Sequence, residues 1–129
     1  MSLLTVLRAA TKGLLFLSES DAPLKPFVWR EVVIDSAVAL LKRLEKDAAT
    51  PVKEVSLAEF FAPMTTPQSW HTEEDKTDVA RFTALVAQLA TLTNPRVFRL
   101  GSGPEIAVYV LGTTPDGATA GVSTELTET

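Results

Sequence analysis

The residue of this chain best suited to metal-directed chemistry is Thr129. Residues 122–129 have the composition of a strand, and we expect that strand to hold Thr129 in an ordered position. As the last residue of the sequence, Thr129 would present a carboxylate beside a hydroxyl. Two oxygen donors held in this way suit a hard divalent cation such as Mg²⁺. The alternative is a frayed chain end without a role.

Glu19 is a second candidate oxygen donor. It stands between Ser18 and Ser20, in a segment that two prolines follow and that we expect to be a loop. The apolar residues 14–16 would anchor the base of this loop. A carboxylate on an anchored loop loses less entropy when it binds a partner. The alternative is an ordinary surface glutamate with a turn or capping role.

Trp70 is a candidate anchor for a protein partner. It ends the polar stretch 65–70, which we expect to be a loop, and the acidic run 73–75 follows it. Tryptophan is enriched among the residues that dominate binding energy at protein interfaces. Thr66 and Gln68 would contact the same partner. The alternative is a tryptophan that covers the edge of the core, as we expect of Trp29.

Three stretches of the chain together resemble a known family. They read GLLFLSES at residues 13–20, TTPQSW at 65–70 with the acidic run 73–75, and NPRVFRLG at 94–101 with 108–112 and the run to Thr129. In this order they resemble the nuclease A inhibitor family of bacteria. The resemblance covers most of the chain apart from roughly residues 32–55, where the sequence diverges.

The resemblance implies a function that the residues alone do not establish. It implies a protein inhibitor of a Mg-dependent, DNA/RNA non-specific endonuclease of the ββα-metal class. The matching glutamate of the family lies at the nuclease's catalytic metal, and the matching tryptophan lies in the interface. The implied partner-binding residues are Glu19, Thr66, Gln68, Trp70 and Thr129, of which Glu19 and Thr129 would reach the partner's Mg²⁺. The inhibitor would need no metal or cofactor of its own and would be a monomer when free.

Length and composition are those of one domain spanning residues 1–129. A chain of 129 residues that is 46% hydrophobic can bury a substantial core. It has no apolar run near the ~20 residues of a membrane span, no export signal, and no cysteine. These features favour a cytoplasmic protein.

Charge is unevenly distributed along the chain. Residues 1–55 carry eight basic and seven acidic side chains, whereas residues 56–129 carry four basic and nine acidic ones. Nucleic acid is therefore not expected as a direct ligand, because phosphate binding needs a basic surface. An acidic half would instead speed encounter with a basic protein. The alternative reading of this charge is ordinary solubility.

Catalysis is not expected. His71 is the only histidine, so a multi-histidine metal site is impossible, and no serine lies in a recognisable nucleophile elbow. The glycines at 101 and 103 have no lysine after them and form no phosphate loop. The leading alternative to an inhibitor is an acidic interaction module that binds a different basic partner. A small-molecule enzyme would require a pocket with convergent polar groups.

The expected elements follow from apolar periodicity and from turn residues. We expect helices over residues 2–12, 35–47, 56–61 (ending before Pro63) and about 75–93. We expect strands over 27–33, 51–55, 97–100, 105–112 and 118–126. The inward residues would be Val38, Leu41 and Leu44 in one helix and Val79, Phe82, Val86 and Leu89 in another.

This order predicts an α+β fold. Helices on both faces of a small sheet would bury it in a three-layer α/β/α sandwich. The short turns between the last strands favour antiparallel pairing, so we expect a small mixed, largely antiparallel sheet. The family that the chain resembles has a sandwich of this kind, described as pathogenesis-related-protein-like.

Overall fold

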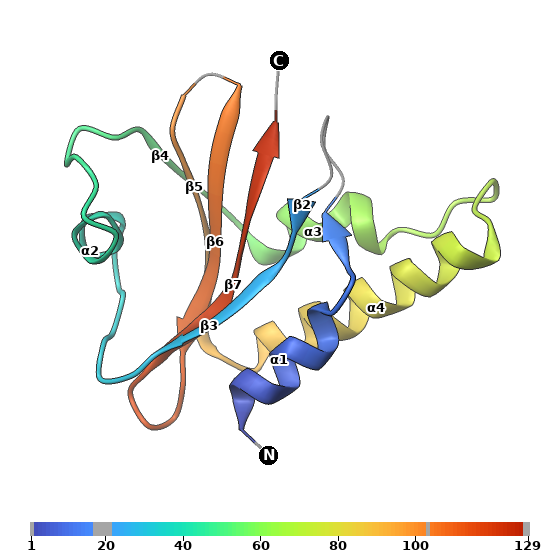
Figure 1. Cartoon of the computed structure of the whole chain (residues 1–129), viewed down its shortest axis with the longest axis horizontal. Coiled ribbons are helices and arrows are strands. Elements are labelled where there is room, and N and C mark those ends of the chain that lie inside the picture. Colours follow the sequence, from blue (N-terminus) through green and yellow to red (C-terminus); the bar gives the residue numbers. More distant parts are fainter. Residues whose placement is uncertain (1, 17–21, 103, 128–129) are drawn as a thin grey trace.

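The structure is a computed structural model that describes residues 2–16, 22–102 and 104–127 (Figure 1). Its helices are α1 (Leu3–Thr11), α2 (Ala37–Arg43), α3 (Leu57–Thr65) and α4 (Glu73–Ala90). Its strands are β1 (Leu15–Phe16), β2 (Ala22–Pro23), β3 (Lys25–Trp29), β4 (Val52–Val55), β5 (Thr93–Leu100), β6 (Glu105–Thr113) and β7 (Thr119–Thr127). The predicted order of elements is confirmed, with β1 and β2 added to it.

The main sheet has five strands in the order β3-β7-β6-β5-β4, and β1 pairs with β2 in a separate ladder. Every strand pair among the described residues is antiparallel, so no parallel pair of the expected mixed sheet is found there. The long β6–β7 ladder runs from Glu105 opposite Thr127 to Thr113 opposite Thr119. The ladder includes Gly121, where an added Cβ would lie 1.8 Å from Val110 O. A side chain at this position would collide with the backbone of β6, so only glycine fits there.

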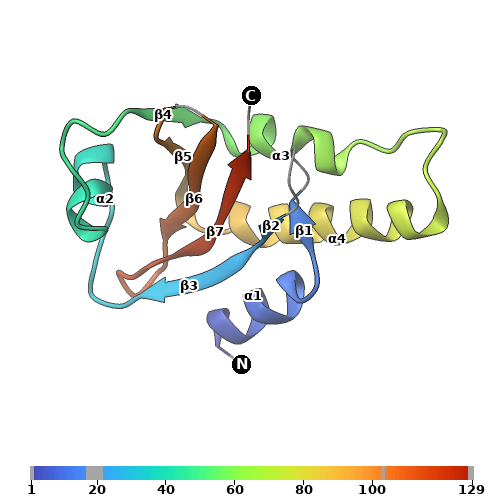
Figure 2. The same cartoon turned by 45° about the horizontal axis from the view of Figure 1, so that its top comes forward.

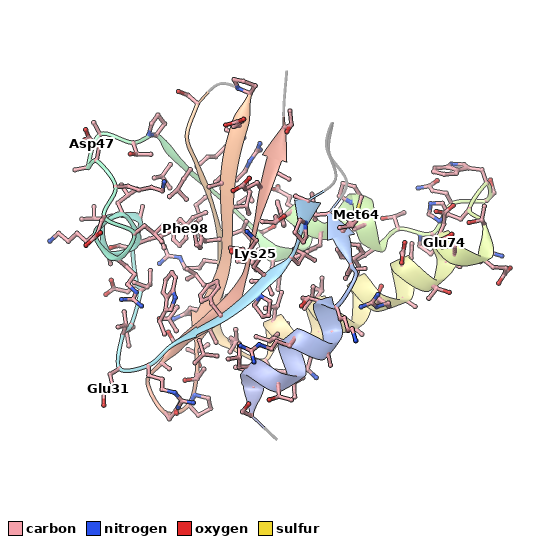
Figure 3. The ribbon with its side chains drawn as sticks, viewed as in Figure 1. Lys25, Glu31, Asp47, Met64, Glu74 and Phe98 are labelled. Atoms are coloured by element: carbon pink, nitrogen blue, oxygen red, sulfur yellow. The ribbon has the colours of Figure 1, made fainter. Side chains whose placement is uncertain are left out.

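Helices cover both faces of the sheet, which confirms the three-layer α/β/α sandwich (Figures 1 and 2). Alternation along the strands divides the core accordingly. On one face, α1, α3 and α4 pack over residues such as Val108, Val110 and Val122. On the other face, α2 packs over Phe98 and Leu111, and Figure 3 shows Phe98 on that side.

Helix α3 is longer than predicted, because it continues through Pro63 to Thr65. Proline removes one backbone donor and was expected to end the helix. Burial of Phe60 and Phe61 holds this turn in the core. The hydroxyl of Thr65 donates to Phe61 O at 3.1 Å, which satisfies a carbonyl near the end of the helix. Tertiary packing therefore outweighs the local penalty of the proline.

Helix α2 is shorter than predicted, and its inner face differs. Glu45 has a φ of 56°, a left-handed conformation that cannot continue an α-helix. Leu40 and Leu41 are buried, whereas Val38 is 61% exposed. The prediction that Val38 points inward is wrong, because the helix turns Leu40 rather than Val38 toward the sheet.

Helix α4 begins and ends slightly earlier than predicted. Thr72 caps it, with its side chain accepting from the backbone N–H of Asp75. The inner stripe consists of Phe82, Leu85 and Leu89, whereas Val79 and Val86 are only partly buried. After α4, Thr93 already belongs to β5, whose register shifts between Thr93 and Arg96.

Candidate partner-binding surface

The connection between α3 and α4, residues 66–72, extends away from the sheet at the outer ends of both helices (Figure 1). We call it the Trp70 loop. Trp70 is 73% exposed, which leaves most of its indole available for contact. The alternative interpretation, in which Trp70 covers the edge of the core, is therefore wrong. Large apolar side chains exposed to this degree commonly mark interaction sites.

A compact turn inside the Trp70 loop fixes the backbone beside the indole. The backbone N–H of Gln68 donates to His71 Nδ1 at 3.2 Å, and the backbone N–H of His71 donates to Gln68 O at 3.2 Å. The rings of Trp70 and His71 meet edge to face, with centroids 4.5 Å apart and planes at 81°. The turn therefore constrains Gln68 and Trp70 together.

Both ends of the Trp70 loop are joined to the helices. The Thr66 hydroxyl donates to Ala62 O of α3 at 2.7 Å. At the other end, Thr72 and Asp75 form a capping box, in which each side chain accepts from the other residue's backbone N–H. The backbone N–H and the hydroxyl of Thr72 lower the pKa of Asp75 below its ordinary value of 3.8.

The start of α4 adds negative charge next to the indole. Glu73, Glu74 and Asp78 are exposed, and Figure 3 shows Glu74 at the outer end of the helix. Lys76 pairs with Glu73 at 3.2 Å, but both side chains are largely exposed and the pair is weak. The surface around Trp70 is thus acidic and suits a basic partner.

Glu19 and Thr129 lie outside the described residues, but the strands that lead to them are described. Phe16 pairs with Ala22, which closes the β1–β2 ladder at the base of the segment that contains Glu19. The hydroxyl of buried Thr124 in β7 donates to Pro23 O in β2 at 3.1 Å. The chain therefore approaches both positions from neighbouring strands. In Figures 1 and 2 these strands lie near the middle of the molecule, whereas the Trp70 loop lies at the far ends of α3 and α4.

The base of the Glu19 segment is anchored in the core as predicted. Phe16 is 6% exposed and stacks on Phe60, with centroids 4.6 Å apart. Its ring edge also meets Phe61 and Phe82. Leu14 is buried, whereas Leu15 points outward and is 43% exposed.

Two hollows flank the end of β7. One of about 310 Å³ lies between β1, α3 and the sheet and is lined in part by Phe16, Lys53 and Leu126. The other, of about 580 Å³, lies toward α2 and is lined in part by Glu105 and Thr127. Neither is enclosed. The described residues contain no group of three or more His, Asp or Glu side chains able to hold a metal ion.

Other polar side chains of the sheet support the fold. Arg96 pairs with Glu54 at 2.8 Å and donates to Asp35 O, which ties the start of the α2 segment to the sheet. Burial raises the pKa of Tyr109, and nearby Glu125 raises it further. His71 is the residue whose role the sequence did not reveal, because nothing in the spacing of residues 66–72 indicates a side-chain bond back to Gln68.

Fold and site define the class of the protein as a small α/β/α sandwich that presents an aromatic residue on an exposed loop before an acidic helix start. Over residues 1–129 the chain matches the model of the nuclease A inhibitor-like protein family, and it belongs to that family. This confirms the resemblance inferred from the sequence and assigns the chain a nuclease as partner. No curated protein matches the chain. Within the described residues, no helix is long and apolar enough to cross a membrane.

Proposed function

We propose that the chain inhibits a Mg-dependent, DNA/RNA non-specific endonuclease of the ββα-metal class by occupying its active site. The observation that carries the proposal is Trp70, exposed on a hydrogen-bonded loop of a nuclease inhibitor-like protein. A preformed loop binds with a smaller entropic cost than a loose one. Trp70 would pack against the nuclease with Thr66 and Gln68 beside it and exclude water from the interface.

The acidic start of α4 supports a nuclease as the target. An enzyme that binds nucleic acid presents a basic surface to the phosphate backbone. Glu73, Glu74 and Asp78 are exposed on the helix that follows the Trp70 loop and would meet that surface. Complementary charge of this kind raises the rate of encounter and is weakened by salt. A total interface of about 1,600 Å² would be ordinary for such a complex.

Glu19 and Thr129 would direct the inhibitor at the catalytic metal of the nuclease. The Thr129 carboxylate would bind the Mg²⁺, and Glu19 would act there directly or through water. A catalytic Mg²⁺ keeps positions that exchange water and phosphate, so these oxygens would replace the scissile phosphate. The hydrogen bond from Thr124 to Pro23 supports this proposal, because it couples the strands that lead to the two residues.

The test is a titration of a ββα-metal nuclease with the untagged protein in Mg²⁺, following DNA cleavage. We expect stoichiometric loss of activity. Full cleavage in the presence of excess folded protein, repeated with several nucleases of the class, would contradict the proposal. The alternative, an acidic module for another basic partner, would then predict capture of a protein without nuclease activity in a Trp70-dependent manner.

A further inference from the structure

We propose that His71 is a positioning residue that holds Gln68 and Trp70 in their binding geometry before the partner arrives. The proposal rests on the proposed function, in which Gln68 and Trp70 contact the nuclease. His71 is itself partly buried against the loop, so its role is to shape the surface rather than to provide contact area.

Three interactions of His71 converge on the two predicted interface residues. Its Nδ1 accepts the backbone N–H of Gln68, and its own backbone N–H donates to Gln68 O. Its ring meets the Trp70 ring at 4.5 Å. The backbone donor and acceptor of Gln68 are thus both used inside the turn, while the exposed Gln68 side chain stays available to a partner.

The chemistry of the bond requires an acceptor at position 71. A neutral imidazole that accepts at Nδ1 carries its proton on Nε2. An aliphatic side chain at this position would leave the Gln68 N–H to water. The turn would then keep only the backbone bond from His71 to Gln68, which is a weak restraint for an exposed loop.

Fixing the turn in the free protein reduces the entropy lost on binding. Thr66 and the Thr72–Asp75 capping box already join the ends of the loop to α3 and α4. His71 restrains the part between them, where Trp70 lies. Loss of one hydrogen bond of ordinary strength and of this restraint would weaken binding about fivefold to tenfold.

Two variants separate the acceptor from the ring. His71→Asn keeps an oxygen acceptor three residues after Gln68 but removes the aromatic contact. His71→Phe keeps an aromatic ring against Trp70 but removes the acceptor. His71→Ala removes both. The residue lies in an exposed loop, so all three variants should fold, and thermal unfolding of each checks that they do.

The first readout needs no partner. ¹⁵N relaxation of the free protein would report the order parameter of the Trp70 indole N–H and of the Gln68 amide. We expect values near 0.85 in the wild type and below about 0.6 in His71→Ala, with substantial recovery in His71→Asn. Equal order parameters in wild type and His71→Ala would overturn the proposal whether or not the protein inhibits a nuclease.

The second readout is the dissociation constant for the nuclease. We expect His71→Ala to raise it about fivefold to tenfold in the wild-type background and by a smaller factor in a Trp70→Ala background, where only Gln68 is left to position. An equal effect in both backgrounds would overturn the role through Trp70. If wild type binds no nuclease, the proposed function fails, while the relaxation data still decide whether His71 positions the loop.

Discussion

Thr124 Oγ1 lies 3.1 Å from Pro23 O, and this hydrogen bond joins the last strand of the sheet to the strand that follows the Glu19 segment. Thr124 is 5% exposed, so the bond is shielded from water. It joins the two parts of the chain from which a metal-directed inhibitor would present its oxygens, next to the pairing of Lys25 with Ser123. Separate segments can act on one metal only if their relative position is fixed.

Removing this hydroxyl should therefore affect both stability and inhibition. Thr124→Val keeps the shape of the side chain but leaves Pro23 O without its donor. We expect a loss of about 1 kcal/mol in the free energy of unfolding and a roughly fivefold higher inhibition constant. The control is Thr83→Val, which removes an exposed hydroxyl bonded to Val79 O in α4. An inhibition constant that changes equally in both variants would refute the specific role of Thr124.

Substitution of the two tryptophans should have different effects, one on nuclease binding and the other on the stability of the fold. Trp70→Ala should weaken nuclease binding by about 2 kcal/mol or more, roughly 30-fold, with almost no change in unfolding. Trp29 instead stacks on Phe27 with centroids 4.4 Å apart, and the Arg43 guanidinium lies 5.0 Å from its ring. Trp29→Ala should cost about 3 kcal/mol of stability and leave the affinity of the folded protein unchanged.

Calorimetric binding and denaturant unfolding of both variants test this assignment. Tight binding by Trp70→Ala would show that the indole is not an anchor. Weakened nuclease binding by fully folded Trp29→Ala would show that the interface includes the face of the sheet that α2 covers.

The capping box predicts a pH dependence of stability. Hydrogen bonds from Thr72 hold the pKa of Asp75 below 3.8, so the ionised carboxylate stabilises the folded state. That contribution is present above pH 3.8 and is lost as the pH falls through the lower, folded-state pKa. The difference in unfolding free energy between wild type and Asp75→Asn should therefore shrink below this pH.

Chemical unfolding of both proteins from pH 2 to 7 would measure the difference. Asp116, whose pKa the Thr114 hydroxyl lowers, is present in both proteins, so its contribution to the pH dependence cancels in the difference between them. A difference that stayed constant down to pH 2 would show that Asp75 is not stabilised in its ionised form.

Extending the chain past Thr129 should weaken inhibition. A short Gly-Ser tail would replace the carboxylate of Thr129 with a peptide bond and place bulk where the proposal puts the metal. The same tail on the N-terminus, ahead of Met1, is the control. We expect a higher inhibition constant with the C-terminal tail alone, measured by DNA cleavage. Equal potency of the two tailed proteins would refute a role for the terminus.

The long elements were predictable because their local signals agree with the tertiary structure. Glycine and proline between residues 100 and 118 mark the turns of the antiparallel β5–β7 meander. Apolar periodicity marks α4, although the cap at Thr72 that sets its start was not predicted. The strands β1 and β2 were missed because two residues each carry no periodicity, and their pairing depends on the core around Phe16.

Tertiary contacts explain the other differences. Pro63 stays inside α3 because Phe60 and Phe61 hold that turn in the core. For the candidate site, exposure of Trp70 could be predicted from its polar surroundings, but the bond from Gln68 to His71 Nδ1 could not. That bond depends on the backbone conformation of the loop, which no pattern in the sequence of residues 66–72 predicts.

The most direct test of the metal-directed mechanism compares affinity with and without the metal. Dissociation constants would be measured for the nuclease in Mg²⁺ and in chelator, using wild type and a variant lacking Thr129. We expect wild type to bind more tightly in Mg²⁺ and the truncated variant to lose most of this metal dependence. Equal affinity of wild type for the metal-loaded and metal-free nuclease would contradict the account.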